Sequence, residues 1–222
     1  MSPTDRYDTS QLVENQHEPG SHGRVLKNLL GIKRKREMNR AEESRFVRLM
    51  DEAVERFESD HRFTAEDIRW LHRFWLADIY VWAGAYRSVN VGKSGFMFAA
   101  AAHVANLMQE FEKDQLNRYT PCNFRDREEL VRALAEVHVE LVLIHPFREG
   151  NGRIARLLSV LMGLQAGLPP LEFSNLRGKK RERYFEAVRA GMDRDYLPMM
   201  AIFSEVIERT VAVAEQPPVR FL

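Results

Sequence analysis

The sequence predicts a mainly α-helical protein with one small β-hairpin inserted before its central helices. Apolar residues recur at helical spacing through most of the chain, and only residues Ser88 to Phe98 alternate as a strand does. The chain has 222 residues and is 45% apolar, which is enough for one sizeable domain with its own core. We therefore expect a single main domain.

The composition excludes several classes of protein. The net charge of +1 does not favour nucleic-acid binding, and the single cysteine, Cys122, excludes both an internal disulfide framework and a multi-cysteine zinc site. Residues 1–16 lack the apolar core of a secretory signal, and no apolar run is long enough to cross a bilayer. We expect a cytoplasmic protein without membrane contact, although a protein exported by a specialised secretion system would look the same.

The two ends of the chain differ from its middle. Residues 1–24 are polar and rich in proline and glycine, so we expect an N-terminal extension, and residues 216–222 are expected to be a C-terminal tail. The main domain then spans residues 25–215. The basic run from Lys33 to Arg36 is better explained as a solvated helix entrance than as a nucleic-acid site.

The first two helices are predicted from apolar spacing and a capping signal. A helix is expected from about Asn39 to Ser59, because apolar residues recur on one face. The residues of that face are Phe46, Met50, Ala53, Val54 and Phe57. Thr64 followed by Asp67 indicates a capped start of the next helix, which we expect to end before Trp82.

The hairpin and the central helices follow. Val89 and Val91 alternate with polar or small residues before a turn near residues 93–95, which predicts the hairpin. Helices are then expected over about 99–111, over 127–144, after the glycines at 150 and 152, over about 179–190 and over about 198–213. The helix over 127–144 stops before Pro146, because proline disfavours helix in the residue that precedes it. His138, inside this helix, is expected to be packed.

The loop between two of these helices carries the chemistry. Its sequence is His145-Pro146-Phe147-Arg148-Glu149-Gly150-Asn151-Gly152-Arg153-Ile154-Ala155-Arg156. The glycines stand where a helix begins, and free backbone N–H groups together with the helix dipole bind anions at such a place. Arg153 and Arg156 are three residues apart, so both can face a polyphosphate.

The remaining loop residues suggest a reaction. A neutral His145 can accept a proton from a hydroxyl, and Glu149 is the one carboxylate in the loop that can help to hold Mg²⁺ beside phosphates. Gly150 and Gly152 permit unusual backbone angles and leave room for a ligand, while the Asn151 side chain can bond either the loop or a phosphate. The loop therefore predicts a site for a phosphate-bearing nucleotide, a divalent metal and a proton acceptor.

Residues 145–156 resemble the motif that defines Fic domains, His-Pro-Phe-x-[Asp/Glu]-Gly-Asn-Gly-Arg-x-x-Arg, at every fixed position. The segments at residues 25–32 and 82–87 and the hairpin are also similar to parts of that family, so that the resemblance covers about residues 25–213. It implies a Fic-type helical bundle whose hairpin forms a flap.

The resemblance also implies an activity, the transfer of AMP from ATP to a Tyr, Ser or Thr hydroxyl of a target protein. His145 would be the base, Glu149 would help to hold Mg²⁺, and the Gly150–Gly152 amides with Asn151 would form the anion hole. Arg153 and Arg156 would hold the β- and γ-phosphates. The flap residues expected to dock the target are Lys93, Ser94, Gly95 and Phe96. Gly152 favours AMP transfer over the phosphate transfer of the Doc branch.

Inhibition is a further implication of the resemblance. Residues 10–15, Ser-Gln-Leu-Val-Glu-Asn, fit the family's inhibitory helix, in which Glu14 would pair with Arg156. A rival pattern lies at residues 204–208, ending in Glu208, but Arg209 breaks its last position, and a separate antitoxin or self-association are other routes. Alternatives for the function are a non-catalytic nucleotide-binding module and a Fic enzyme that uses another nucleotidyl donor.

Overall fold

The computed structural model describes residues 11–93, 95–174 and 178–215. The long helices are α1 (Lys35–Arg56), α2 (Ala65–Leu76), α3 (Val104–Phe111), α5 (Arg127–Ile144), α6 (Asn151–Gln165), α7 (Lys179–Ala190) and α8 (Leu197–Ala214). The short elements are η1 (Val13–Asn15), η2 (Ala101–His103), the π-helical turn η3 (Glu112–Leu116), α4 (Asn117–Tyr119) and η4 (Gly191–Asp193). The hairpin consists of β1 (Gly92–Lys93) and β2 (Phe96–Met97). This mainly helical architecture confirms the predicted fold class.

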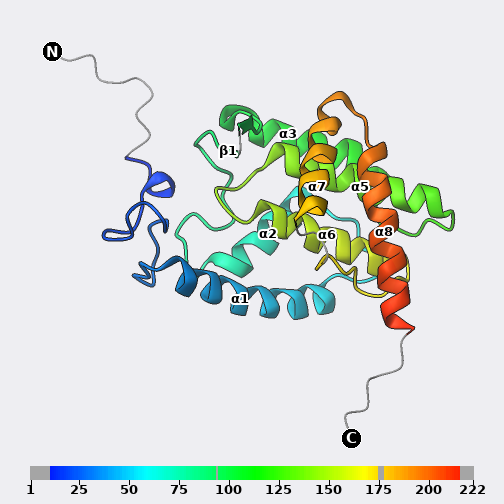
Figure 1. Ribbon diagram of the computed structural model, residues 1–222, viewed down its shortest axis with the longest axis horizontal. Coiled ribbons are helices and arrows are strands. Elements are labelled where there is room, and N and C mark those ends of the chain that lie inside the picture. Colours follow the sequence, from blue (N-terminus) through cyan, green and yellow to red (C-terminus); the bar gives the residue numbers. More distant parts are fainter. Residues whose placement is uncertain (1–10, 94, 175–177, 216–222) are drawn as a thin grey trace, which may run out of the picture.

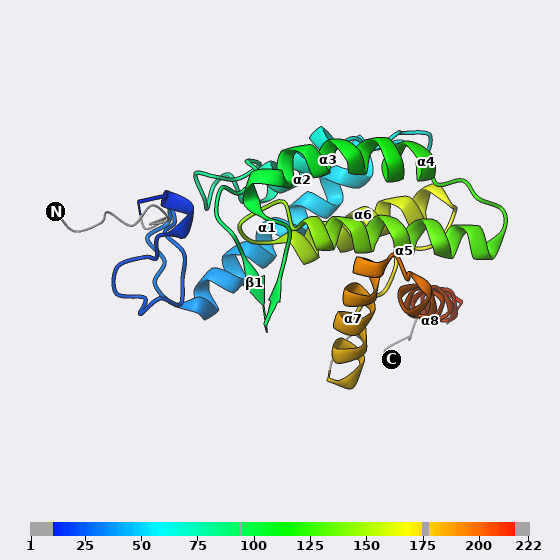
Figure 2. The ribbon, with the colours of Figure 1, turned by 90° about the horizontal axis from the view of Figure 1, so that it is seen from above.

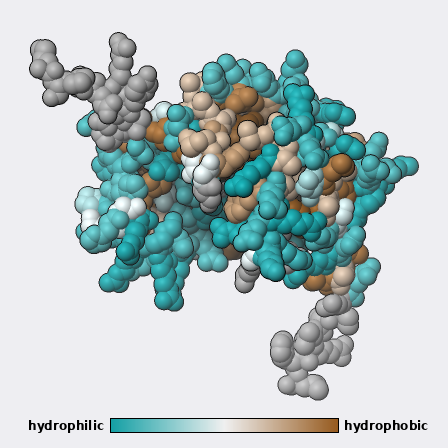
Figure 3. Space-filling view, turned by 45° about the horizontal axis from the view of Figure 1, so that its top comes forward, coloured by the Kyte–Doolittle hydropathy of each residue, from teal (hydrophilic) through white to brown (hydrophobic). Residues whose placement is uncertain are grey.

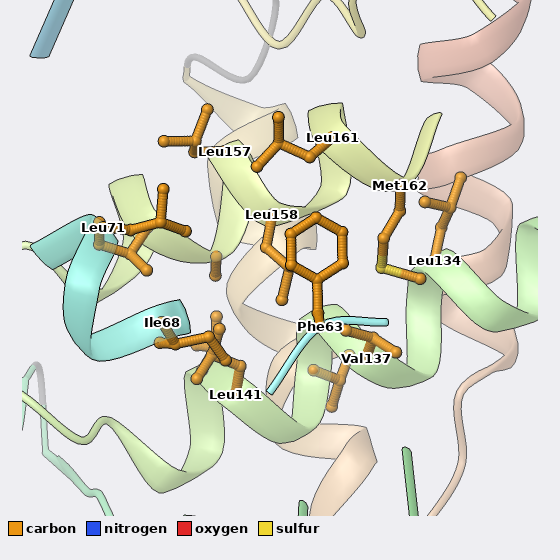
Figure 4. Packing of buried hydrophobic residues seen from close by; sticks show 14 of the residues in the cluster. Phe63, Ile68, Leu71, Leu134, Val137, Leu141, Leu157, Leu158, Leu161 and Met162 are labelled. Atoms are coloured by element: carbon orange, nitrogen blue, oxygen red, sulfur yellow. The ribbon is translucent and has the colours of Figure 1, made fainter. Parts of the chain in front are cut away.

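Helices α5 and α6 form the centre of the molecule. Helix α5 packs against both α6 and α8, while α1 and α2 pack against each other and contact α6 from the other side (Figure 1). Their apolar faces meet in a core, part of which is drawn in Figure 4. The labelled core residues are Phe63, Ile68, Leu71, Leu134, Val137, Leu141, Leu157, Leu158, Leu161 and Met162. The two helices that carry the loop at residues 145–150 are therefore held rigidly along their length.

The predicted helices agree well with the structure, with one difference in a helix face. Helix α5 has the predicted bounds, and Thr64 caps α2 through a reciprocal pair of hydrogen bonds with Asp67. In α1, however, Met50 and Val54 are exposed, and the buried residues are Met38, Glu42, Leu49 and Ala53. The prediction was right for Ala53 and Phe57, which are buried, and for Phe46, which packs against the core, but it was wrong for Met50 and Val54 and it missed the buried Glu42. The helix α2 also ends earlier than expected, at Leu76.

The hairpin and helix α7 project from the same side of α5 and α6 (Figure 2). The strands pair antiparallel, with Gly92 opposite Met97 and Lys93 opposite Phe96. This confirms the predicted hairpin, although each strand has only two residues. Residues of the hairpin, of the α5–α6 loop and of α7 line a common cavity.

The N-terminal segment is more closely attached than its composition suggests. Residues 11–24 follow the surface near the start of α1, where His17 bridges to Leu26 and Glu14, Ser21 and Val25 are buried. The domain boundaries at residues 24 and 215 stay predictions. The face shown in Figure 3 is mostly hydrophilic, with hydrophobic residues gathered near its middle. Within the described ranges, no helix is both long and apolar enough to pass through a bilayer.

Two buried histidines should make the protein sensitive to mild acid. Burial lowers the pKa of both His72 and His138 to about 3, whereas an unfolded chain protonates histidine near pH 6.5. Their contribution to stability is therefore complete above pH 6.5 and is lost as the pH falls toward 3. We expect the free energy of unfolding to fall by about 1.4 kcal/mol per pH unit for each histidine between pH 6 and pH 5. Urea unfolding at half-unit pH steps measures this slope, and a flat response in that window would contradict it.

Candidate active site

The loop between α5 and α6 is closed by one side chain, Asn151. Its Oδ1 accepts a hydrogen bond from the Phe147 N–H at 2.8 Å, and its Nδ2 donates to the Phe147 carbonyl at 2.7 Å. The Asn151 side chain is buried, so both bonds are shielded from water. The sequence left open whether the Asn151 side chain bonds the loop or a phosphate, and the structure shows that it bonds the loop.

Gly150 begins helix α6 in a conformation that only glycine adopts easily. Its φ of 85° is left-handed, and a Cβ atom there would lie 2.6 Å from Cζ3 of Trp75. His72 fixes the preceding residue, because its Nδ1 accepts from the Gly84 N–H and its Nε2 therefore donates to the Glu149 carbonyl at 3.1 Å. The turn is thus held from the side of helix α2.

His145 is oriented by its own helix. Its backbone is left-handed (φ 52°), and its Nδ1 lies 3.1 Å from the Val142 carbonyl, to which it donates. This bond leaves Nε2 as the ring nitrogen with a lone pair. The ring stacks on Phe98 of the hairpin, with 3.6 Å between the ring centroids. Burial lowers the pKa of His145 to about 4, and the nearby charge of Arg87 lowers it as well. The imidazole is therefore neutral at pH 7 and able to accept a proton.

Arg87 joins the hairpin to the end of helix α5. Its guanidinium donates to the carbonyls of Ile144 and His145 and to those of Val89 and Ala99, which lie at the two stems of the hairpin. Arg87 is buried, and burial lowers its pKa somewhat while leaving it charged. Sequence reasoning missed this role, because three of the four carbonyls lie 12 to 58 residues away in the chain.

A cavity of about 940 Å³ lies in front of the loop. It is lined by the hairpin, by residues 148–153 and Arg156, and by one face of α7, and His145 forms part of its wall. Tyr184 of α7 also lines it, but its hydroxyl donates to Nε2 of the buried His138 at 2.8 Å. The structure therefore brings the predicted base, glycines and arginines together at one cavity. His138 is packed, as predicted.

The start of helix α6 offers an anion-binding site within this cavity. The N–H groups of Arg153 and Ile154 bond the Gly150 carbonyl, whereas those of Asn151 and Gly152 bond no described residue. Arg156, one turn further along, forms no ion pair within the described part of the chain. Burial lowers its pKa, yet a guanidinium stays charged at neutral pH. A partly desolvated cation beside unpaired helix N–H groups favours a phosphate-bearing ligand.

The carboxylate of Glu149 lies in the same cavity as these N–H groups. Its side chain is 41% exposed and lines the cavity, with Oε1 3.0 Å from the Gly150 nitrogen and 3.7 Å from Arg153 Nη2. In the ranges that the structure describes, no cluster of three or more His, Cys, Asp or Glu residues would hold a metal alone. The residues present therefore fit Mg²⁺ bound by one carboxylate and phosphate oxygens, which is how this ion commonly binds.

Arg153 is held by a residue that sequence reasoning missed. Glu42 of α1 is 1% exposed and accepts from Arg153 Nη2 at 2.7 Å and from the Tyr80 hydroxyl at 2.9 Å. The Arg153 guanidinium also lies over the Trp75 ring, 4.2 Å from its centroid. A glutamate in an amphipathic helix gives no signal of burial, so only the tertiary contact identifies Glu42.

Glu14 does not pair with Arg156, and that prediction was wrong. Its carboxylate accepts hydrogen bonds from the Ser88 N–H and hydroxyl, and its carbonyl accepts from Arg148 Nε at 2.9 Å. The segment forms only the single 3₁₀ turn η1, which places the carboxylate against the entry to the hairpin. Ser10, the first residue of the proposed inhibitory pattern, lies outside the described residues. Glu208 forms no ion pair with Arg156 in the described chain either.

The flap residues occupy the hairpin as predicted from the sequence, except that Ser94 lies outside the described residues. Lys93 and Phe96 face each other in the register and line the cavity, and Gly95 has a left-handed φ of 76° in the turn. Their role in docking a target stays a prediction.

Alanine at Gly150 should lower the stability of the fold, whereas alanine at Gly152 should lower the affinity for ATP. Gly150→Ala should lower the free energy of unfolding by on the order of 3 kcal/mol, because it combines left-handed strain with a clash against Trp75. Gly152 is helical, and the nearest atom to an added Cβ is Arg156 Nη1 at 3.7 Å, so Gly152→Ala should fold normally. It should instead weaken ATP binding roughly tenfold by placing a methyl group at the anion site. Urea unfolding and calorimetric titration with ATP measure both effects, and equal destabilisation by the two changes would contradict the expectation.

Removal of the Arg153 charge should lower the stability of the protein more than removal of the Glu42 charge. Arg153→Met leaves a fully buried carboxylate without its cation and should cost about 3 kcal/mol of stability. Glu42→Gln should cost on the order of 1 kcal/mol, because Arg153 is 30% exposed and keeps water contact. The control is Glu37→Gln in the same helix, which breaks an exposed pair with the N-cap residue Arg34 and should change the stability by no more than about 0.5 kcal/mol. Thermal and urea unfolding would test this order.

Comparison with known proteins identifies the family. Residues 62–162 match the family model for the Fic/DOC family. The chain is 31% identical over 153 residues to "Protein adenylyltransferase Fic" of Drosophila grimshawi and 32% identical over 152 residues to that of Nematostella vectensis. Each match covers 67% of this chain, but only 29% and 33% of the respective relative. The chain therefore spans about a third or less of the length of these curated relatives.

Solved structures share the fold. The N-terminal Fic domain of a VirB-translocated effector from Bartonella sp. AR 15-3 has a TM-score of 0.74 at 20% identity and covers 91% of this chain and 95% of that one. The BepC protein of Bartonella tribocorum, solved with bound AMPPNP, has a TM-score of 0.69 at 22% identity, with coverage of 88% and 97%. Together with the complete motif at residues 145–156, these findings show that the chain belongs to the Fic/DOC family.

Proposed function

We propose that this protein transfers AMP from ATP to a hydroxyl group of a target protein and releases pyrophosphate. One observation carries the proposal. The unprotonated Nε2 of His145 shares a cavity with the unpaired N–H groups at the start of α6 and with the uncompensated charge of Arg156. A proton acceptor beside a polyphosphate site fits nucleotidyl transfer to an alcohol. The names of the curated relatives and the AMPPNP bound to BepC support the same reaction.

The nucleotide would bind through its phosphates. The Asn151 and Gly152 N–H groups would bond the α-phosphate region, and Arg156 would hold the outer phosphates, with the remaining donors of Arg153 beside it. Glu149 would hold Mg²⁺ together with phosphate oxygens. When bound, this ion would neutralise part of the negative charge of the phosphates.

His145 would act on the incoming hydroxyl. Its Nε2 accepts the hydroxyl proton as the oxygen forms a bond to the α-phosphorus, and the bond from that phosphorus to the bridging oxygen breaks. The leaving group is pyrophosphate. The hydrogen bond to Val142 and the stacked Phe98 ring hold the imidazole in position, so that little reorganisation is needed. An extended segment of the target would pair with the exposed edge of the hairpin through backbone hydrogen bonds, a common way in which proteins bind peptides.

The place of action and the partners are part of the proposal. We propose action in the cytoplasm on a protein target, with action after export as the alternative that the translocated Bartonella effectors raise. Because Glu14 does not pair with Arg156, we propose that a separate antitoxin or self-association inhibits the protein. Cell fractionation of the tagged protein would separate the two locations.

The activity is tested with ATP labelled at different phosphates. Incubation with Mg²⁺ and a lysate should give protein labelled from [α-³²P]ATP and none from [γ-³²P]ATP. His145→Ala should lower the labelling by roughly 10²- to 10⁴-fold, as expected when a general base is lost. The control is His103→Ala, an exposed histidine outside the cavity, which should label as the unaltered protein does.

Several results would contradict the proposal. Label from the γ-phosphate would indicate phosphate transfer instead, and strong competition by CTP, GTP or UTP would indicate another donor. ATP binding without transfer to any protein, for the unaltered chain and for Glu14→Gly, would favour a non-catalytic nucleotide-binding module.

A further inference from the structure

The N-terminal segment reaches the candidate active site through Glu14. This residue is 9% exposed, and its carboxylate accepts hydrogen bonds from the Ser88 N–H at 2.8 Å and from the Ser88 hydroxyl. Ser88 directly follows Arg87 at the entry to the hairpin. The Glu14 carbonyl accepts a further bond, at 2.9 Å, from Nε of Arg148, a loop residue that lines the cavity. Glu14 therefore contacts both the hairpin and the α5–α6 loop.

A folded strap carries Glu14 to this place. We call residues 12–28 the N-terminal strap. Its two halves pair antiparallel around the bridge between His17 and Leu26. Directly after the strap, the Leu29 N–H donates to the Ile79 carbonyl at 2.8 Å, which attaches the strap to the helical domain. Because the strap is ordered in this way, little conformational entropy is lost when Glu14 is placed against the hairpin.

The charge of Glu14 balances that of Arg87. The Arg87 guanidinium is buried and bonds carbonyl oxygens, which carry no net charge. Burial lowers the pKa of Arg87, and the nearby charge of Glu14 raises it. A buried charge is costly without a charge of opposite sign. The Glu14 carboxylate therefore stabilises the guanidinium that joins the hairpin to the end of helix α5.

The entry to the hairpin and the loop meet at the same junction. The Arg87 N–H donates to the Pro146 carbonyl at 2.9 Å, so this part of the hairpin lies beside the residue that follows the candidate base. Glu14 bonds Ser88 on the first of these two segments and Arg148 on the second. Loss of its side chain would therefore free the hairpin from one of the contacts that hold it against the loop.

We propose that Glu14 is a positioning residue, and that the N-terminal strap holds the hairpin where it can present a target hydroxyl to His145. In this role the strap supports AMP transfer instead of inhibiting it. This inference rests on the proposed function, because it concerns how the same site is assembled. The bonds of Glu14 lead to Ser88 and Arg148 and not to the start of α6, so its side chain acts on the target and not on the nucleotide.

Hydrogen exchange tests this role without any need for turnover. Glu14→Ala removes the acceptor of both Ser88 donors, whereas Glu14→Gln keeps an acceptor oxygen and loses the charge. In the full chain, Glu14→Ala should speed exchange roughly tenfold at three amides that hold the hairpin, and Glu14→Gln should have an intermediate effect. These amides, which bond the Pro146, Val91 and Leu143 carbonyls, are those of Arg87, Phe98 and Ala99. Exchange within helix α6 should not change.

The matched control is Glu18→Ala. Glu18 belongs to the same strap, but its carboxylate bonds Asn28 and not the hairpin. Removal of this carboxylate should leave exchange at the three hairpin amides unchanged. The control therefore separates the contact with Ser88 from the general stability of the strap.

Labelling from [α-³²P]ATP separates the placing of the target from nucleotide binding. With a lysate as acceptor, Glu14→Ala should lower the maximal rate of protein labelling roughly tenfold and leave the apparent KM for ATP within about twofold. Glu14→Gln should give an intermediate rate, and Glu18→Ala should label as the unaltered chain does. Calorimetric titration should give the same Kd for ATP in all four proteins.

The outcomes distinguish this inference from the proposed function. An equal maximal rate in Glu14→Ala and the unaltered chain would overturn the inference while leaving AMP transfer intact. Faster labelling by Glu14→Ala would show that Glu14 inhibits, and it would overturn the inference as well. Faster exchange of the hairpin amides in Glu14→Ala, with no labelling by any variant, would support the role of the strap and contradict the proposed function. An equal loss of rate in Glu18→Ala, or a weaker affinity for ATP that explains the loss, would overturn the inference.

Discussion

The closure of the α5–α6 loop by the Asn151 side chain is the constraint on which the site depends. Its amide bonds both backbone groups of Phe147 in a buried place, where each unmade bond would cost about 1–3 kcal/mol. Because the side chain satisfies the loop, the backbone N–H groups of Asn151 and Gly152 remain for a ligand. Gly150, with its left-handed backbone, then begins helix α6, and Trp75 fills the space that a larger side chain at position 150 would need.

The charges around the loop are arranged in two ways. Arg153 has Glu42 as its counter-ion and the Trp75 ring as its support. Arg87 is satisfied by carbonyl oxygens alone. Arg156 has no counter-ion among the described residues, although burial lowers its pKa. The cations that shape the loop therefore have their hydrogen-bond donors occupied by the protein, whereas Arg156, which lines the cavity, keeps its charge available to an incoming anion.

Local signals predicted much of this structure. Periodic apolar residues predicted the bounds of α5, and the Thr64–Asp67 capping box predicted the start of α2. The loop sequence singled out His145, the glycines and the arginines, which the structure brings to one cavity. The predictions that were wrong concern residues whose positions depend on contacts between distant segments. Charge gave no sign that Glu42 is buried, and the apolar pattern of α1 wrongly included the exposed Met50 and Val54 in the core face. Similarly, a short pattern suggested an inhibitory role for Glu14, but the fold sets its carboxylate against Ser88.

Arg87 has a mechanical consequence. The same guanidinium bonds both stems of the hairpin, at Val89 and Ala99, and the carbonyls of Ile144 and His145. A chain that pulls on the hairpin therefore also pulls on the backbone that carries the imidazole. The hairpin and the backbone of His145 are linked by one planar, five-donor group, so a displacement of the hairpin is transmitted to His145 through a single side chain.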